Sequence, residues 1–507
     1  MSEKVLTPPS AQDKKYLKIS EFILYLVGVF FYTNMTGMVG SYRSAYLVNV
    51  LRLNENQTSL FNTLVNIIPF VLNFFITMYI DGRRPGKMGK FRPLALAVAI
   101  PCGMLLVLSF WAPPALSGNL LLIYVTTIAV LWAVVTNFGD AMNKVAFVMT
   151  PNLKERDNVI SFRSICSAVG NSAPLVIVLV IGLIWKDEGT QYIISAALCA
   201  AVGTICMLVA TKAIRERVTY SNEKKNPLVG IKDVLVNKYA WVIFISEFLK
   251  NFRQIATFMG VFLAAALLGS TSQYLWFGLP TGIGTAVGML VINFLLKKFN
   301  SKVLYIASGI YSVIINTIAF IVGYLYFNNP SAILQILFIV FLFLIGLQFG
   351  ASNLLPSMFQ ADVLEDIELK TGKRLDATLP FVIGIFTMIS GTIAQALAPL
   401  ILYGKNSIIG YIQPTDAVPE PEQSLRTRIL MLFFYTVFHG IMMFLAGVPF
   451  FFYKLTGKTK EDIHQAVLER RKEFDKNSDT KAEPAPEPES ETEPESESEI
   501  GPESEQE

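Results

Sequence analysis

Long apolar stretches recur along the whole chain, with only short polar connections between most of them. A helix that crosses the core of a bilayer needs roughly 20 apolar residues. Twelve runs satisfy this requirement, near residues 20–48, 57–80, 92–113, 119–149, 159–185, 191–211, 239–268, 273–296, 302–327, 331–356, 378–404 and 426–454. The pattern therefore predicts an all-α membrane protein with twelve transmembrane helices. The first run is followed by no small-residue cleavage site, so we expect no cleavable signal peptide.

A basic stretch at residues 212–238 separates the first six runs from the last six. Two six-helix halves around a central cavity are the arrangement of the major facilitator fold, which this pattern resembles. The expected parts are a cytoplasmic N-terminus (1–19), an N-terminal six-helix half (20–211), a central cytoplasmic loop (212–238), a C-terminal six-helix half (239–454), a cytoplasmic amphipathic helix (455–476) and a disordered acidic tail (477–507).

Lysine and arginine collect in every second loop. Basic loops follow the second, fourth, sixth, eighth and tenth runs, whereas residues 113–119, 269–273 and 328–330 carry no charge. Because basic loops remain on the cytoplasmic side of a membrane, this alternation predicts that both termini are cytoplasmic.

Composition supports a membrane protein and argues against a soluble enzyme. Only 16% of the residues are charged, 53% are hydrophobic and the mean hydropathy is +0.48, whereas soluble proteins carry about 25% charge. Two histidines and four scattered cysteines provide no framework for a metal site or disulfides. No set of nucleophile, base and orienting group is visible, and we expect neither enzymatic activity, a cofactor nor a nucleic-acid partner.

The net charge of +3 conceals an uneven distribution. Residues 475–507 hold thirteen acids and two lysines, so the rest of the chain holds 40 bases and 26 acids. A segment of Glu, Pro and Ser with few apolar residues cannot bury enough surface to fold, so we predict a disordered tail. The sequence identifies no partner for it.

Three cytoplasmic loops combine acids and bases in specific patterns. The first, Asp81–Pro93, has an acid, a run of bases and Gly-Lys-Phe-Arg-Pro. The second, Ala361–Asp376, has Ala-Asp, a further acid and Glu-x-Lys-x-Gly-x-Arg. Glu155–Arg163, a looser match, has two arginines seven residues apart. These loops resemble those of the glycoside–pentoside–hexuronide:cation symporters, the family typified by the melibiose permease. The resemblance implies a sugar transporter in the plasma (cell inner) membrane, driven by H+ or Na+.

Acids and bases at the cytoplasmic ends of both halves can pair across a closed gate and separate when it opens. Basic loops that only set topology would not need the interleaved acids, so we favour a gating role over topology alone. The predicted gate residues are Asp81, Arg83, Arg84, Lys90, Arg92, Arg156, Arg163, Asp362, Glu365, Glu368, Lys370 and Arg374.

Ionisable residues within membrane spans are costly and are candidates for function. Asp140 follows Trp132 by eight residues, and the resemblance implies that this aspartate helps to hold substrate and cation. Four residues on, where the melibiose permease has a sugar-stacking tryptophan, this chain has Lys144. A lysine can bind a carboxylate, sulfonate or phosphate. Alternatively, Lys144 neutralises Asp140 or extends to the membrane surface.

The family's usual cation site is largely missing. Its paired acids in the second helix align with Pro69 and Asn73, and its lysine in the eleventh helix aligns with Met388. Sodium needs hard, preferably anionic, oxygen ligands, and Asn73 supplies one neutral oxygen. Cation coupling therefore either involves Asp140, Glu247 and Asn73, or it is absent and the protein is an uncoupled facilitator.

The surplus of bases within the spans suggests an anionic solute. The candidate substrate-binding residues are Asp140, Lys144, Arg43, Lys250, Arg253, Asn34, Asn137 and Gln254. The competing interpretation is a structural charge network that pairs Asp140 with Lys144 and Glu247 with Lys250.

Together these features predict a secondary transporter that moves a sugar or glycoside by alternating access. The alternative substrates are an anionic or an amphiphilic, lipid-like solute. A transport-inactive receptor or scaffold is a remote alternative, because a receptor has no need for the gate loops.

Overall fold

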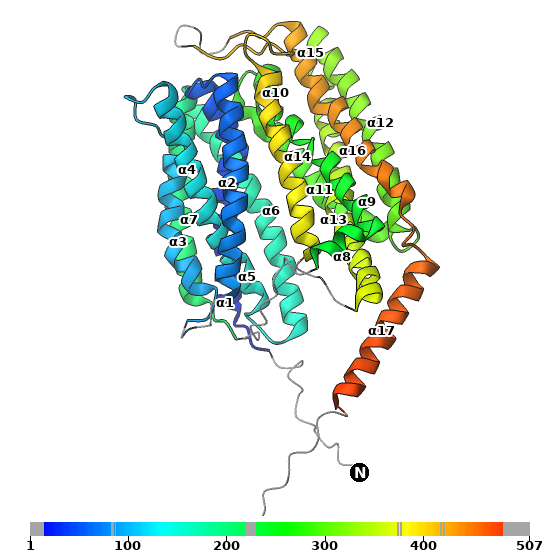
Figure 1. The fold of residues 1–507 in the computed structure, drawn as a ribbon. Helices are drawn as coiled ribbons and strands as arrows, with labels where there is room; N and C mark the ends of the chain where they lie inside the picture. Colours follow the sequence, from blue (N-terminus) through cyan, green and yellow to red (C-terminus); the bar gives the residue numbers. More distant parts are fainter. Residues whose placement is uncertain are drawn as a thin grey trace, which may run out of the picture.

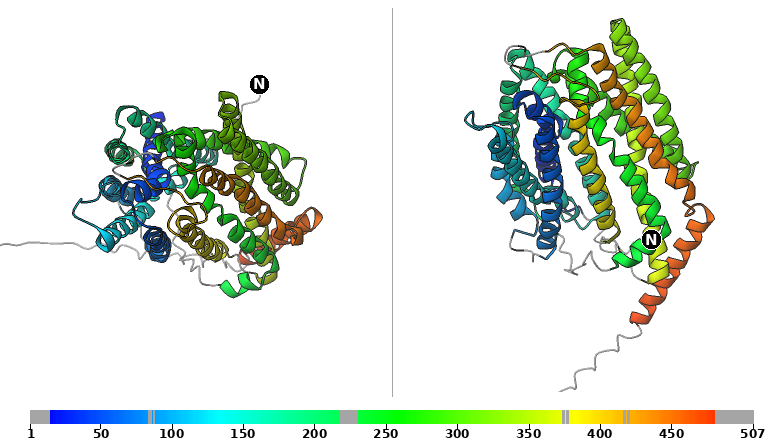
Figure 2. Two further views of the ribbon diagram at one scale, coloured as in Figure 1. Left: turned by 90° about the horizontal axis from the view of Figure 1, so that it is seen from above. Right: turned by 45° about the horizontal axis from the view of Figure 1, so that its top comes forward.

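The apolar runs of the sequence form long helices that lie side by side in two groups (Figures 1 and 2). The computed structural model describes residues 15–82, 86, 88–217, 230–372, 375, 378–415, 418 and 421–479. Within these ranges it does not describe the side chains of residues 78, 81–82, 153–154, 157, 468 and 470–479.

The N-terminal half comprises α1 to α7. Its elements are α1 (Ile19–Ala45), η1 (Tyr46–Val50), α2 (Glu55–Gly82), α3 (Arg92–Leu108), α4 (Gly118–Gly139), α5 (Ala141–Lys144), η2 (Val145–Phe147), α6 (Leu153–Ile184) and α7 (Glu188–Ala213). Helix α1 packs against both α6 and α7, and α3 packs against α4 and α7.

The C-terminal half comprises α9 to α16 and is preceded by the short helix α8. Helix α8 spans Ile231–Val236. The elements of the half are α9 (Lys238–Asn251), α10 (Gln254–Leu268), η3 (Thr271–Tyr274), α11 (Leu275–Leu295), α12 (Ser301–Asn328), α13 (Ala332–Thr371), α14 (Thr378–Leu402), α15 (Leu425–Phe433), η4 (Phe434–Phe438), α16 (His439–Gly447) and η5 (Val448–Phe452). Helix α17 (Lys458–Asp479) follows.

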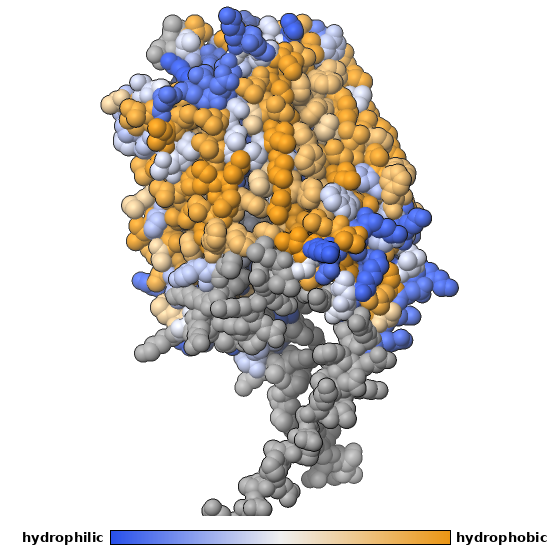
Figure 3. All heavy atoms as spheres, viewed as in Figure 1, coloured by the Kyte–Doolittle hydropathy of each residue, from blue (hydrophilic) through white to orange (hydrophobic). Residues whose placement is uncertain are grey.

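The predicted all-α membrane architecture is confirmed. Among the described residues, eleven helical segments are long and apolar enough to cross a membrane, and α3, an apolar helix of 17 residues, occupies the position of the remaining predicted span. Large apolar side chains such as Leu183, Leu290 and Ile333 are exposed on the outer faces of these helices. The face of the molecule in Figure 3 is broadly hydrophobic, which is the kind of surface that a bilayer covers.

Glycines allow α11 and α13 to approach to backbone contact. Gly284 and Gly288 on α11 face Gly346 and Gly350 on α13, so each helix carries a Gly-x-x-x-Gly pair at the crossing. Small residues at this spacing let membrane helices pack closely without a hydrophobic driving force.

Substitution of Gly284 by Ala should destabilise the protein by about 1–3 kcal/mol because an added Cβ would lie 2.1 Å from the carbonyl oxygen of Phe343. The measurement is the Tm of the purified protein in detergent. Gly282→Ala on the same helix is the control, since its Cβ would meet only Ser172 Oγ at 3.8 Å. Equal Tm values for the two variants would contradict the close crossing.

The two ends of the bundle differ in their contents. One end, called the basic end here, carries residues 88–91 and 214–217, helix α8 and the start of α17, and lies at the bottom of Figure 1. The other, called the opposite end, carries residues 403–415 and the start of α15.

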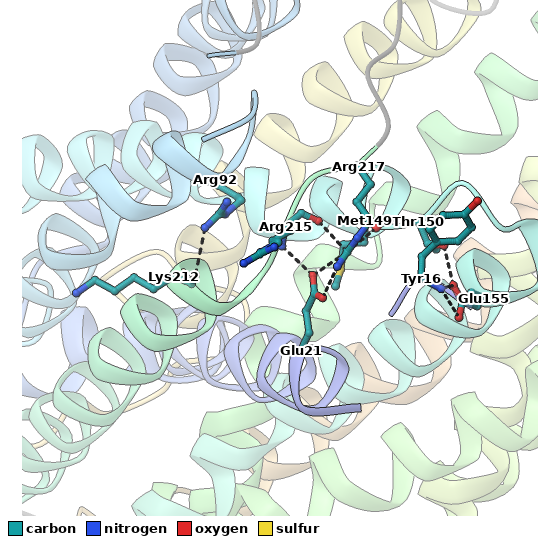
Figure 4. A network of polar contacts seen from close by, with 9 residues as sticks. All are labelled: Tyr16, Glu21, Arg92, Met149, Thr150, Glu155, Lys212, Arg215 and Arg217. Atoms are coloured by element: carbon teal, nitrogen blue, oxygen red, sulfur yellow. Dashed lines mark hydrogen bonds and ion pairs between the residues drawn. The ribbon is translucent and has the colours of Figure 1, made fainter. Parts of the chain in front are cut away.

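At the basic end, residues 214–217 cross the N-terminal half as a strap (Figure 4). The Glu21 carboxylate on α1 accepts hydrogen bonds from the Arg217 guanidinium at 2.7 and 2.9 Å and from the Arg215 backbone N–H at 2.8 Å. Arg217 Nη1 also donates to the Met149 carbonyl at 2.9 Å. The hydrogen bond to Glu21 is the main cause of a raised pKa of Arg217, outweighing its partial burial. The strap therefore ties α1 to the end of α7 and to η2.

Helix α17 begins against the basic end of α13 and then extends away from the bundle (Figure 1). Lys460 Nζ lies 2.7 Å from Asp362 Oδ1, and His464 Nδ1 lies 3.0 Å from Glu365 Oε1. Val467 on the same helix is buried. The predicted amphipathic helix at 455–476 thus contacts the C-terminal half through two polar pairs and an apolar side chain.

Candidate substrate-binding site

A cavity of about 580 Å³ lies in the N-terminal half, among α1, the α4–α5 junction and α6. Hydroxyl, amide and charged side chains dominate its wall. The lining residues are Thr33, Thr36, Asp140, Asn143, Lys144, Arg163, Ser164, Ser167, Ala168 and Asn171. Such a mixture of hydrogen-bond donors and acceptors suits a small polar solute.

The Asp140 carboxylate is oriented toward α1 by its neighbours. Tyr32 OH donates to Asp140 Oδ1 at 3.2 Å and to the Thr136 carbonyl at 2.7 Å, and Asn143 Nδ2 reaches Asp140 Oδ1 at 3.3 Å. Gly139 leaves room for the Tyr32 ring, because a Cβ there would lie 2.8 Å from it. Two neutral donors thus hold the carboxylate at the cavity wall.

Asp140 and Lys144 do not form the ion pair that the sequence spacing allowed. Helix α4 ends at Gly139, and α5 is a separate four-residue turn in which the Asp140 carbonyl accepts from both the Asn143 and Lys144 N–H groups. The Lys144 N–H donates to the Asp140 carbonyl as in a regular helical turn, but the Asp140 carboxylate is held by Tyr32 and Asn143, so the spacing alone does not produce an ion pair.

Two cations line the cavity without a carboxylate partner within the described residues. Lys144 is one, and Arg163 on α6 is the other. Arg163 Nη1 donates to the Asn143 carbonyl at 3.2 Å, its Cζ lies 5.9 Å from the centre of the Phe147 ring, and its buried Nε has no hydrogen-bond partner. Arg163 thus presents a half-buried guanidinium at the cavity wall, and a cationic donor of this kind can bind an anionic ligand.

The other predicted cations do not line this cavity. Arg43 lies over the Phe61 ring at 5.5 Å, and Arg253 lies over the Phe349 ring at 5.3 Å. Lys250 pairs with Glu247 on α9, as the charge-network interpretation predicted. Of the two pairs in that network, Glu247–Lys250 is present, whereas Asp140 and Lys144 do not form an ion pair.

The predicted amide ligands also lie elsewhere. Asn34 is buried on α1 and both polar atoms of its side chain lack hydrogen-bond partners, while Asn137 and Gln254 are half-buried outside the cavity wall. Asn73 Oδ1 is buried without a partner on α2. Among other amides, Asn66 Nδ2 donates to Gln395 Oε1 at 3.0 Å, which joins α2 to α14. That contact illustrates the structural role that amides play between membrane helices.

Comparison with known proteins identifies the family. Residues 24–457 match the family described as MFS/sugar transport protein. The chain belongs to this family. The assignment confirms the resemblance to sugar symporters, and it makes the protein a multi-pass membrane transporter rather than an enzyme.

The relatives are distant but extend over most of this transporter. The uncharacterized symporter YjmB of Bacillus subtilis (strain 168) is 24% identical over 467 residues, which cover 90% of this chain and 97% of that protein. The putative glycoside/cation symporter YagG of Escherichia coli (strain K12) is 24% identical over 409 residues, covering 76% and 81%. A putative sulfoquinovose importer of the same organism is 22% identical over 368 residues, covering 69% and 74%.

Solved structures show the same fold. The nucleoside transporter NupG is similar with a TM-score of 0.59 at 13% identity, over 86% of this chain and 100% of that one. The xylose transporter XylE from E. coli is similar with a TM-score of 0.53 at 13% identity, over 86% and 98%. At these identities the similarity establishes the major facilitator fold alone.

Several predicted gate residues of this transporter are engaged within their own half. Arg92 donates to the carbonyls of Thr211 and Lys212, Asp362 and Glu365 contact α17, and Lys370 pairs with Asp366 on the same helix. Arg156 is half-buried near the start of α6, and Glu368 and Lys90 lie at the end of α13 and beside the start of α3. The side chain of Asp81, and Arg83, Arg84 and Arg374, fall outside the described residues.

Sequence reasoning missed a set of polar contacts that join the halves at the opposite end. Thr271 Oγ1 donates to Glu188 Oε1 at 2.7 Å and lies 2.7 Å from Tyr192 OH. Tyr411 OH donates to Asn49 Oδ1 at 3.2 Å. We call Asn49, Glu188, Tyr192, Thr271 and Tyr411 the outer cluster. Their spacing along the chain carries no signal, because the contacts bridge residues up to 362 positions apart.

Proposed function

We propose that this protein is a secondary transporter that moves an acidic sugar or glycoside by alternating access, with its basic end and both termini on the cytoplasmic side of the plasma (cell inner) membrane. The supporting observation is the pair Lys144 and Arg163, two cations without carboxylate partners among the described residues of a polar cavity. Asp140 in the same wall offsets part of their charge, so the three groups together remain positively charged. Such charge is costly inside a membrane protein, and an anionic substrate reduces that cost when it binds.

The rest of the cavity wall suits the neutral part of such a substrate. Thr33, Thr36, Ser167 and Asn171 offer hydroxyl and amide groups that can both donate and accept hydrogen bonds, as sugar hydroxyls do. The anionic group would be a carboxylate or a sulfonate, and the name of the E. coli relative, a putative sulfoquinovose importer, is consistent with the second.

Transport would be coupled to protons through Asp140. This carboxylate lies in the same cavity wall as Lys144 and Arg163, so its charge and that of the substrate affect each other directly. Sodium coupling has less support, because Asn73 provides one neutral oxygen where a sodium site needs several hard ligands.

The conformation is best interpreted as closed at the outer, non-cytoplasmic end. The outer cluster joins the two halves there, and Tyr403 OH donates to Thr58 Oγ1 at 2.6 Å beside it. The acids Asp362 and Glu365 contact α17 instead of bases of the N-terminal half. In the alternate state, we expect the outer cluster to separate and the predicted cytoplasmic gate pairs to form.

Substitution of Thr271 by Val should shift the transporter toward the outward-facing state by about tenfold, because it removes a hydrogen bond to the half-buried Glu188 carboxylate without changing the side-chain shape. The measurement is maleimide labelling of Ser164→Cys from the cytoplasmic side, in a background without the native cysteines. Labelling should become slower. Thr285→Val is the matched control, since Thr285 Oγ1 donates only to the Thr281 carbonyl of its own helix. Unchanged labelling in Thr271→Val would contradict the gating role.

The experiment that tests the function is counterflow in proteoliposomes with a panel of neutral and acidic glycosides, with and without sodium and a pH gradient. We expect exchange of acidic sugars, stimulation by a pH gradient and indifference to sodium. Exchange restricted to neutral sugars would overturn the substrate class, and indifference to both ions would make the protein an uncoupled facilitator.

A further inference from the structure

We propose a binding site for the headgroup of an anionic phospholipid at the basic end of the C-terminal half. A second cavity, of about 500 Å³, lies there between α8, the start of α9 and the end of α13. It is separate from the candidate substrate site, all of whose lining residues belong to the N-terminal half. Its lining residues are Lys232, Asp233, Val236, Asn237, Lys238, Ile367, Lys370 and Thr371.

Three lysines and one aspartate give this cavity a positive charge. Lys232 and Lys238 are exposed and have no carboxylate partner among the described residues. Lys238 Nζ and Lys370 Nζ both lie over the Tyr239 ring, at 5.0 and 5.6 Å from its centre. Ammonium groups from two different helices, α9 and α13, thus lie close to this ring.

The base of the site is fixed by a buried carboxylate. Asp366 accepts from Asn237 Nδ2 and from Lys370 Nζ, each at 2.6 Å. Asn237 Oδ1 in turn accepts from the N–H groups of Tyr239 and Ala240, which caps α9. The end of α13 and the α8–α9 junction are thus held together beneath the lysines, so the positions of the cations do not depend on flexible loops.

An apolar surface adjoins the lysines. Leu235, Val236 and Trp241 expose 38%, 76% and 41% of their surfaces. Trp241 Nε1 donates to the Leu235 carbonyl at 2.8 Å, and its indole ring packs against Phe244 and Phe386 while part of its surface stays exposed. Exposed tryptophan is typical of the membrane–water interface, and in Figure 3 hydrophilic atoms adjoin the hydrophobic surface near α8.

This combination matches a phospholipid better than a soluble anion. The phosphate would contact the lysines, and the acyl chains would leave along the exposed apolar side chains into the bilayer. Basic pockets at the cytoplasmic ends of membrane helices have this chemistry. The inference uses only the orientation from the proposed function and none of its transport chemistry.

The test is native mass spectrometry of the full-length protein in detergent, titrated with phosphatidylglycerol or phosphatidylcholine. We expect the wild type to retain phosphatidylglycerol preferentially. The double variant Lys232→Gln/Lys238→Gln should lose on the order of 30-fold in apparent affinity for phosphatidylglycerol. Lys232→Arg/Lys238→Arg keeps the charge and should bind as the wild type does.

Lys297→Gln/Lys298→Gln is the matched control, because it removes the same charge from exposed lysines after α11, outside the cavity. An equal loss in this control would overturn the site in favour of a general effect of surface charge. Equal retention of the two lipids by the wild type would also overturn it. Displacement of phosphatidylglycerol by equimolar glycerol 3-phosphate would reassign the cavity to soluble anions. None of these results depends on whether the protein transports an acidic sugar.

Discussion

Replacing Lys144 by Met should reduce the transport of an acidic glycoside by about 100-fold, and Arg163→Gln should have an effect of similar size. Each substitution removes a cation that lines the cavity, and loss of one partner of a hydrogen-bonded charge pair costs about 2–5 kcal/mol. The measurement is the concentration dependence of counterflow in proteoliposomes, which reports the loss as a higher KM for the acidic sugar.

The neutral counterpart of the same sugar serves as the internal control. Its weak exchange should be unchanged or improved in Lys144→Met, because the methionine no longer presents an uncompensated charge to it. Lys212→Met tests for a general effect of charge, since Lys212 is exposed at the end of α7 and does not line the cavity. If acidic and neutral sugars lose transport equally in Lys144→Met, with normal amounts of protein in the membrane, the residue has a structural role instead.

Asp140→Asn should abolish proton-driven accumulation and retain counterflow. The asparagine can still accept from Tyr32 and Asn143, but it cannot bind and release a proton. One proton per solute allows accumulation of up to about tenfold per unit of pH gradient, and this gain should vanish in the variant. The measurement is uptake into proteoliposomes with an imposed pH gradient, compared with exchange at equal pH on both sides.

The net charge moved in each transport cycle provides a second test of proton coupling. A monoanionic sugar carried with one proton moves no net charge, so uptake by the wild type should follow the pH gradient and ignore a membrane potential set by potassium and valinomycin. Glu247→Gln is the comparison variant, because Glu247 is the other candidate proton site and pairs with Lys250 in the C-terminal half. Loss of accumulation in Glu247→Gln, with Asp140→Asn still accumulating solute, would transfer the coupling role to Glu247.

Some of the residues predicted for the site line the cavity and others do not, and this difference has a physical reason. Asp140 and Lys144 line one cavity because both belong to the α4–α5 segment, and local spacing kept them together. Arg43 and Arg253 are on other helices, where aromatic rings of neighbouring helices accommodate them. Arg163, expected at the gate, lines the cavity, because α6 passes beside the α4–α5 junction.

Some properties follow from the sequence by itself. The bilayer core imposes about 20 apolar residues on each crossing helix, so the spans, the all-α class and the break at 212–238 are visible in the hydropathy pattern alone. The loop motifs at Asp81–Pro93 and Ala361–Asp376 were enough to recognise the family that the match over residues 24–457 establishes. These signals are local, since each depends on residues close together in the chain.

Only the tertiary structure decided which polar groups meet. The outer cluster, the Glu21–Arg217 strap and the α8–α13 cavity each join residues more than 100 positions apart. No pattern in a single sequence indicates that residues so far apart are in contact. Likewise, the Asp140 carboxylate contacts Tyr32 and Asn143 in place of the ion pair with Lys144 that the spacing favoured. Helix packing therefore determines which charges remain available to a solute, since it places some beside a partner and leaves Lys144 and Arg163 at a cavity wall.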